Sequence, residues 1–203
     1  MSAQGQRADL IAIKRQIDAG VSTKRIAEDE SLFPTWIKFP KQFDHYKRII
    51  TKPRETKPTV FLFIGPSQTG KTRTAMTLAR YLGTVYKVPP KSTGFWCDDY
   101  ANETVFLIDE MSGSKMTPEF FNELLDWYPM NVPAHGSAGH IFNSPYVFIC
   151  TNYLPSSWWK HRKPDQVKQT MRRIDVIIKM FNPVAPKQLC PHCVQGLCAF
   201  HHP

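Results

Sequence analysis

One octapeptide combines glycine, lysine and hydroxyl side chains at a spacing that suits phosphate chemistry. The segment Gly65–Thr72 reads GPSQTGKT and fits G-x-x-x-x-G-K-[ST] at every fixed position. Its glycines let the loop curve so that backbone N–H groups surround phosphate oxygens. Lys71 can then reach the β- and γ-phosphates of ATP, and the Thr72 hydroxyl can ligate Mg²⁺. The residues expected to bind the nucleotide are Gly65, Pro66, Ser67, Gln68, Thr69, Gly70, Lys71, Thr72 and, later in the chain, Asp109.

Polar side chains suited to the same reaction follow two further apolar runs. Asp109 and Glu110 come after residues 105–108, and Asn152 follows the run that begins at Tyr146. At the carboxyl edge of a parallel sheet, Asp109 would hold Mg²⁺ through water and Glu110 would polarise the attacking water. Asn152 would contact the γ-phosphate, although alone it would equally suit an ordinary turn. The second acid, Glu110, favours hydrolysis over phosphoryl transfer to a bound acceptor. The succession of three strand-end motifs along the chain, GKT, then DE, then TN, favours the phosphate-contacting role of Asn152 over a turn role.

Two arginines late in the chain are candidates to supply a positive charge to the nucleotide site of a neighbouring subunit. Nucleotide hydrolysis of this kind commonly draws a positive charge from outside the subunit that binds the nucleotide. Arg172 and Arg173 are the candidates. The alternative is a solvated basic helix face, and the sequence does not decide between the two arginines.

The elements that would position these residues alternate between strand and helix. The β-rich run 60–64 is typical of a buried parallel strand, and residues 73–81 predict a helix whose N-terminus faces the phosphates. With the runs at 105–108 and 146–150, they predict an α/β fold with a parallel central sheet, the architecture of P-loop NTPases. We expect this domain to span residues 59–181.

The flanking regions have a different character. Apolar spacing predicts helices at 9–19, 22–29 and 41–50, with Gly20 as a stop and Ser22 as an N-cap. Residues 1–50 would form a small helical module, used either for subunit contacts or as a helix-turn-helix. Residues 51–58 are polar and contain prolines, as linkers do, and residues 182–203 form a tail.

Charge and hydropathy limit the class of protein. The chain of 203 residues has 26 Lys and Arg against 17 Asp and Glu, a net charge of +9. That excess favours a polyanionic partner, nucleic acid first, with general solubility as the alternative. Enough apolar residues are present to build a core. No apolar run approaches the roughly 20 residues of a membrane span, and the N-terminus lacks an apolar signal region, so we expect neither membrane insertion nor secretion.

The five cysteines fall into two groups. Cys97 and Cys150 are isolated among apolar residues and are expected to be small buried side chains. The others are clustered close to a histidine, a set that fits tetrahedral zinc but equally fits free thiols in a tail. The candidate zinc ligands are Cys190, Cys193, Cys198 and His201.

Taken together, residues 7–181 resemble the superfamily 3 helicase domain of replication-associated (Rep) proteins, closest to the circovirus-like group of circular single-stranded DNA viruses. Besides the phosphate loop, the resemblance rests on FWCDDY (95–100) ahead of VFLIDEM, on WYP (127–129), on VFICTN (147–152) and on RRI (172–174). The N-terminal helices look like the oligomerisation module that precedes this domain.

This resemblance implies an AAA+-like ATPase that forms a hexameric ring around single-stranded DNA and unwinds DNA 3′ to 5′ in rolling-circle replication, in the host nucleus. It also implies a β-hairpin at residues 130–145 that contacts DNA. His135 and Gly136 stand at its tip, where a lysine is expected, so the grip would be weak or pH-sensitive. Lys115 is a possible substitute for the missing lysine.

The family's nicking domain, with its His-hydrophobe-His metal site, has no counterpart before the linker. We expect a chain that does not cut DNA, whether a helicase-only product, a fragment or half of a split gene, with a nicking Rep protein as a possible partner in trans. Three rival interpretations remain: an RNA-virus superfamily 3 helicase acting on RNA, a P-loop kinase, and a non-catalytic Rep relic that binds DNA.

Overall fold

The computed structural model describes residues 7–90, 95–136, 138–160 and 163–181. Its first part is a bundle of short helices, α1 (Ala8–Asp18), α2 (Thr23–Glu28), α3 (Phe33–Trp36) and α4 (Pro40–Ile50). Ser22 caps α2, as predicted, by accepting a hydrogen bond from the Arg25 amide at 3.4 Å. The bundle has its own apolar core, made of Ile13, Ile17, Ile26, Leu32, Trp36 and Phe43.

The second part is built on a five-stranded parallel sheet with the strand order β2-β3-β6-β1-β7. The three predicted runs form its interior, β1 (Thr59–Ile64), β3 (Val105–Ile108) and β6 (Tyr146–Thr151). Short strands that the sequence analysis did not anticipate form its edges, β2 (Val85–Lys87) and β7 (Val176–Lys179). The predicted α/β fold with a parallel central sheet is therefore confirmed.

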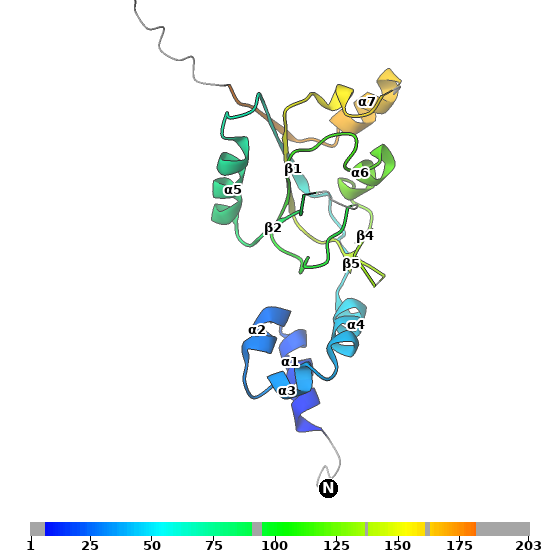
Figure 1. Ribbon diagram of the computed structural model, residues 1–203. Coiled ribbons are helices and arrows are strands. Elements are labelled where there is room, and N and C mark those ends of the chain that lie inside the picture. Colours follow the sequence, from blue (N-terminus) through cyan, green and yellow to red (C-terminus); the bar gives the residue numbers. More distant parts are fainter. Residues whose placement is uncertain (1–6, 91–94, 137, 161–162, 182–203) are drawn as a thin grey trace, which may run out of the picture.

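Helices cover both faces of this sheet (Figure 1). Helix α5 (Lys71–Leu82) lies on one face, where Ala75 and Ala79 pack with Phe63. On the other face lie α6 (Pro118–Leu124) and α7 (Pro164–Met171), next to the short helix η1 (Pro155–Ser157). Leu62 packs on that face with Phe121 of α6. Because side chains alternate along a strand, β1 can bury a residue against each helical layer.

A small hairpin projects from the sheet domain on the side of the helical module (Figure 1). Strands β4 (Asn131–Val132) and β5 (His140–Ile141) pair antiparallel, within the segment where the hairpin was predicted. Gly136 and Gly139 both have left-handed backbones, with φ of 63° and 81°. The turn uses conformations that glycine adopts without a steric penalty.

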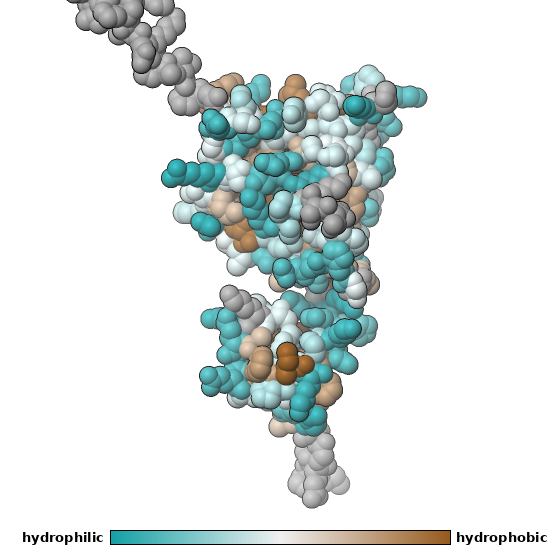
Figure 2. Space-filling model, viewed as in Figure 1, coloured by the Kyte–Doolittle hydropathy of each residue, from teal (hydrophilic) through white to brown (hydrophobic). Residues whose placement is uncertain are grey.

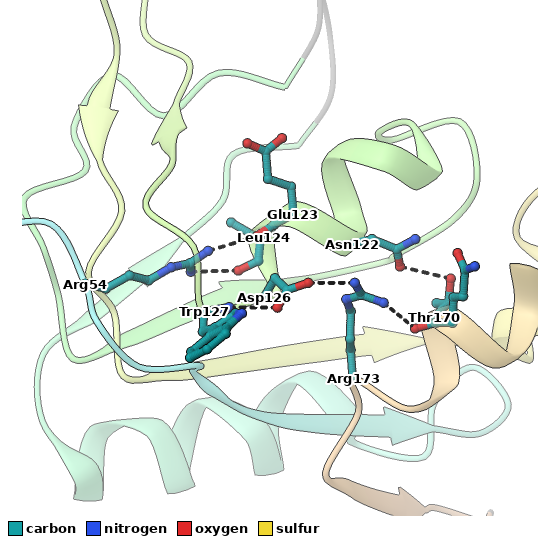
Figure 3. A network of polar contacts seen from close by, with 9 residues as sticks. Arg54, Asn122, Glu123, Leu124, Asp126, Trp127, Thr170 and Arg173 are labelled. Carbon is teal, nitrogen blue, oxygen red and sulfur yellow. Dashed lines mark hydrogen bonds and ion pairs between the residues drawn. The ribbon is translucent and has the colours of Figure 1, made fainter.

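The segment between module and sheet is anchored by one arginine (Figure 3). Arg54 is only 8% exposed. Its guanidinium donates to the carbonyls of Glu123 and Leu124, both at 2.8 Å, and to that of Tyr128 at 2.9 Å. The first two are carbonyls at the C-terminal end of α6, which have no partner within the helix. Arg54 therefore caps α6 from a segment that composition alone marks as a polar linker.

Hydrophilic residues dominate the face shown in Figure 2, and hydrophobic residues gather there in small groups. Across the part of the chain that the structure describes, no helix has both the length and the apolar character to cross a bilayer. Cys97 and Cys150 are buried, as expected, and burial raises the pKa of each thiol to about 12.

Candidate nucleotide site

The phosphate loop joins the end of β1 to the start of α5, and its backbone accounts for both glycines. A Cβ on Gly65 would lie 2.0 Å from the Met180 carbonyl oxygen, so no larger residue fits beside the chain leaving β7. Gly70 has open space around it but a φ of 79°, a left-handed conformation that favours glycine. Gly65 is required because the Met180 backbone lies so close, and Gly70 is favoured because of its left-handed backbone conformation.

Lys71 and Thr72 begin α5 and direct their side chains to the two ends of the site. The Lys71 amine donates to the Pro66 carbonyl at 2.5 Å, so the side chain turns back over the loop. The Thr72 hydroxyl donates to Asp109 Oδ1 at 2.7 Å, across the gap between α5 and the end of β3. A hydroxyl and a carboxylate oxygen in contact form a donor set that fits Mg²⁺.

Asp109 has a second partner that the sequence analysis missed. The Lys87 amine, at the end of β2, lies 2.8 Å from Asp109 Oδ2. Burial opposes ionisation of this carboxyl group. The hydrogen bonds from Lys87 and Thr72 outweigh that effect and place the pKa of Asp109 below its usual value. Asp109 is therefore a carboxylate at neutral pH, with one oxygen on Thr72 and the other on a lysine.

Glu110 occupies a backbone conformation that is unusual for its type. Its φ is 51°, in the left-handed region, where a residue other than glycine carries a strain of about 1–3 kcal/mol. Its amide donates to Asp109 Oδ1 at 3.1 Å, and its side chain is exposed at the nucleotide pocket. Strain of this kind is often found at functional sites, where the surroundings hold a residue in place.

Asn152 follows β6 and faces the phosphate loop, because β6 pairs with β1 along its whole length. Its amide nitrogen lies 3.4 Å from the Ser67 hydroxyl. Together these residues line a pocket of about 310 Å³, a size at the lower end for small-molecule sites. The lining residues are Ser67, Gln68, Gly70, Lys71, Thr72, Arg73, Asp109, Glu110, Cys150, Thr151 and Asn152.

The two candidate arginines have different surroundings, and Figure 3 shows those of Arg173. Arg173 is paired with Asp126, with 2.6 Å between Nη2 and Oδ2, and it also donates to the Gln169 carbonyl at 2.7 Å. Its side chain is 15% exposed. Arg172, at the end of α7, is exposed. Neither lines the pocket of its own chain. Arg173 thus makes a structural contact within the chain, whereas Arg172 is available to another molecule.

The hairpin tip is fastened to the loop before β3. The His135 amide donates to Asp98 Oδ1 at 2.6 Å, and its Nδ1 lies 2.9 Å from Oδ2 of the same carboxylate. The His135 ring also packs against Trp96 at a tilt of 32°, with 4.1 Å between ring centroids. His140 Nε2 lies 3.0 Å from the Asp98 carbonyl oxygen. The histidines therefore hold the hairpin in place, while Gly136 remains exposed.

The expectation that Lys115 supplies charge to nucleic acid is wrong for this structure. Lys115 is 8% exposed, and its amine donates to the backbone carbonyl of Asp109. Burial lowers the pKa of this amine, and the nearby charges of Asp109 and Glu110 partly oppose that shift. The side chain thus lies behind the nucleotide pocket without lining it, because the turn after Glu110 brings it back to the end of β3.

The candidate zinc ligands Cys190, Cys193, Cys198 and His201 lie outside the described residues. Within the described ranges, no group of three or more His, Cys, Asp or Glu side chains could hold a metal ion.

Comparison with known proteins agrees with the geometry of the pocket. No curated protein matches the chain. Residues 61–153 run from β1 to just beyond β6 and include the phosphate loop, Asp109, Glu110 and Asn152. This stretch matches the family model described as RNA helicase, a family of superfamily 3 helicase domains, which supports an NTP-hydrolysing, helicase-type domain that uses Mg²⁺.

Proposed function

We propose that this chain is an ATP-dependent helicase subunit that moves along single-stranded DNA, 3′ to 5′, in the replication of a circular viral genome. The observation that supports this most directly is the meeting of three strand ends at one pocket. There the phosphate loop, the Asp109–Glu110 pair and Asn152 lie around a volume of about 310 Å³. These residue types cover phosphate binding, metal binding and the positioning of water.

In the proposed mechanism, Lys71 leaves the Pro66 carbonyl and contacts the β- and γ-phosphates, while the loop amides bind phosphate oxygens. Thr72 and Asp109 would hold Mg²⁺, which would neutralise developing phosphate charge. Glu110 would accept a proton from the attacking water, and Asn152 would orient the γ-phosphate against the loop. The amide of Asn152 already reaches Ser67.

Arg172 would complete the site of a neighbouring subunit. It is exposed and lies outside the pocket of its own chain, as a residue acting in trans must. A ring of subunits, six in the related Rep helicases, would place each Arg172 at the next pocket. Arg173 and Asp126 would fix the end of α7, and with it the direction of Arg172.

Single-stranded RNA is a second candidate substrate, because the matching family model is described as an RNA helicase. The motif resemblance to Rep proteins favours DNA. Both polyanions suit a net charge of +9.

The test is ATP hydrolysis with single-stranded DNA, with single-stranded RNA and without nucleic acid, using Lys71→Ala as the control. We expect DNA to stimulate turnover and Lys71→Ala to lose about 100-fold or more, since the lysine contacts the transferred phosphate. Stronger stimulation by RNA would replace the DNA assignment. Unchanged turnover in a folded Lys71→Ala protein would refute the nucleotide site itself.

A further inference from the structure

The peptide unit between Asp109 and Glu110 is fixed at both of its polar groups. Its N–H donates to Asp109 Oδ1 at 3.1 Å, and its C=O accepts a hydrogen bond from the Lys115 amine. The orientation of this unit helps to set φ of Glu110, which is 51°. The Lys115 contact therefore acts on the backbone torsion that directs the Glu110 side chain.

The chain after Glu110 is fixed to the sheet as well. The Met111 amide donates to the Cys150 carbonyl at 2.8 Å, and the Thr151 hydroxyl donates to the Met111 carbonyl at 2.8 Å. Both partners belong to β6, the strand that precedes Asn152. The strained residue thus lies between a side-chain contact on its N-terminal side and contacts with β6 on its C-terminal side.

The turn that carries Lys115 is itself rigid. The Lys115 amide donates to the Ser112 carbonyl at 3.0 Å, which closes the turn. A Cβ on Gly113 would lie 1.3 Å from the Trp158 carbonyl oxygen, so the turn packs directly on that backbone. The Trp159 indole donates to the Met116 carbonyl at 2.9 Å. These contacts fix the backbone of the turn that carries Lys115, while the Lys115 amine points at the end of β3.

Burying an amine in this place has a cost that packing alone does not explain. Lys115 is 8% exposed, and no ion pair with a carboxylate is found for it among the described residues. A buried lysine usually gains a carboxylate partner, because an unpaired buried charge is unfavourable. Here the amine contacts a backbone carbonyl beside two acids of the nucleotide site.

We propose that Lys115 is a positioning residue for hydrolysis, holding the Asp109–Glu110 peptide so that the Glu110 carboxylate faces the attacking water. This inference rests on the proposed function of the pocket. It assigns to Lys115 a role in the catalytic step and none in binding the nucleotide, because the lysine contacts only the backbone behind the site.

The experiment compares Lys115→Met with wild type and with Lys115→Arg. Methionine retains an unbranched apolar stem and removes the donor, whereas arginine retains a donor. We expect Lys115→Met to lower kcat about 10- to 100-fold, the scale of a misplaced reacting group. The Kd for a fluorescent ADP analogue with Mg²⁺ should stay within about twofold, and Lys115→Arg should recover part of kcat. Lys168→Met, on the exposed face of α7, is the matched control.

A double-mutant cycle separates positioning from a general loss of structure. If Lys115 acts through Glu110, Lys115→Met should slow a Glu110→Gln protein by no more than about twofold. If the fold losses of kcat in the two single variants multiply in the double variant, the proposal is overturned. An unchanged kcat in Lys115→Met, or a loss of ADP affinity equal to its loss of kcat, would also overturn it. If Lys115→Met does not melt cooperatively, Lys115→Leu, which also lacks a donor, takes its place with the same expected separation of kcat from Kd.

A structural readout makes this test independent of the proposed function. In a crystal structure of Lys115→Met, we expect Glu110 to leave the left-handed region near its present φ of 51°. Retention of that φ would overturn the positioning role even if wild type hydrolysed no nucleotide. If the wild-type protein hydrolyses no ATP but Glu110 is displaced in the Lys115→Met structure, the proposed function is refuted. The role of Lys115 in holding the backbone is then still supported.

Discussion

Replacing Arg54 by methionine should destabilise the sheet domain by about 3 kcal/mol. The guanidinium donates to three backbone carbonyls, at 2.8, 2.8 and 2.9 Å, and methionine can serve none of them. Each such bond contributes about 1 kcal/mol net, since water in the unfolded chain also binds these groups. Methionine also loses the cation–π contact of the guanidinium, which lies 4.9 Å from the centroid of the Phe142 ring, but one such contact contributes less than the three hydrogen bonds together. The loss should therefore come mainly from the hydrogen bonds.

The assay is thermal and urea unfolding of the whole chain. For a chain of this size, about 2–4 °C of Tm corresponds to 1 kcal/mol, so we expect a fall of about 6–12 °C. The Tm of Arg54→Lys should lie between those of wild type and Arg54→Met, because a single ammonium group cannot reach all the carbonyls that the planar guanidinium binds. Arg80→Met, exposed on α5, is the matched control and should change Tm little. If Arg54→Met lowers the free energy of unfolding by less than about 1 kcal/mol, the capping role is refuted.

Lys87→Met should lower the Mg²⁺ concentration needed for half-maximal binding of a fluorescent ADP analogue roughly two- to fivefold, the scale of a partly exposed ion pair. The reason is that Lys87 lies on Asp109 Oδ2, where its ammonium competes with the metal; a higher Mg²⁺ requirement would contradict this. Arg172→Ala should reduce nucleic-acid-stimulated ATPase by about 10³-fold while Tm stays constant. Arg173→Ala should lower Tm, because it leaves Asp126 without its ion-pair partner, and equal Tm values for the two variants would show that the arginines are not specialised as described.

The nucleotide pocket was largely predictable because its residues carry local signals. The phosphate loop has a fixed spacing, and the strands before it and before Asp109 are apolar runs bounded by polar residues. Parallel strands bring their carboxyl ends to one edge of a sheet, so the sequence alone predicts that Asn152 lies beside the loop. Ser22 was likewise recognisable as a cap from its position alone.

The remaining contacts are long-range and leave no local pattern. Lys87 ends a three-residue edge strand and meets Asp109 only because β2 pairs with β3. Arg54 lies in a polar stretch with prolines, where composition indicates a linker, yet its partners are about seventy residues away in the sequence. Lys115 was named as a possible substitute for the lysine missing at the hairpin tip, whereas a tight turn directs it inward. Helix α3 is too short, at four residues, for apolar periodicity to reveal it.

The strand order also sets when during synthesis the nucleotide site can form. Strand β1 carries the phosphate loop, but its neighbours are β6 and β7, with Thr59 opposite Tyr146 and Phe61 opposite Val176. Long-range parallel pairing of this kind is slow to form, because a large loop must close before any contact compensates for it. A nascent chain that has already exposed the phosphate loop therefore lacks both strands that support it. Nucleotide binding becomes possible only when almost the whole sheet domain has left the ribosome, and a chain truncated before β7 would expose the edge of β1 to aggregation.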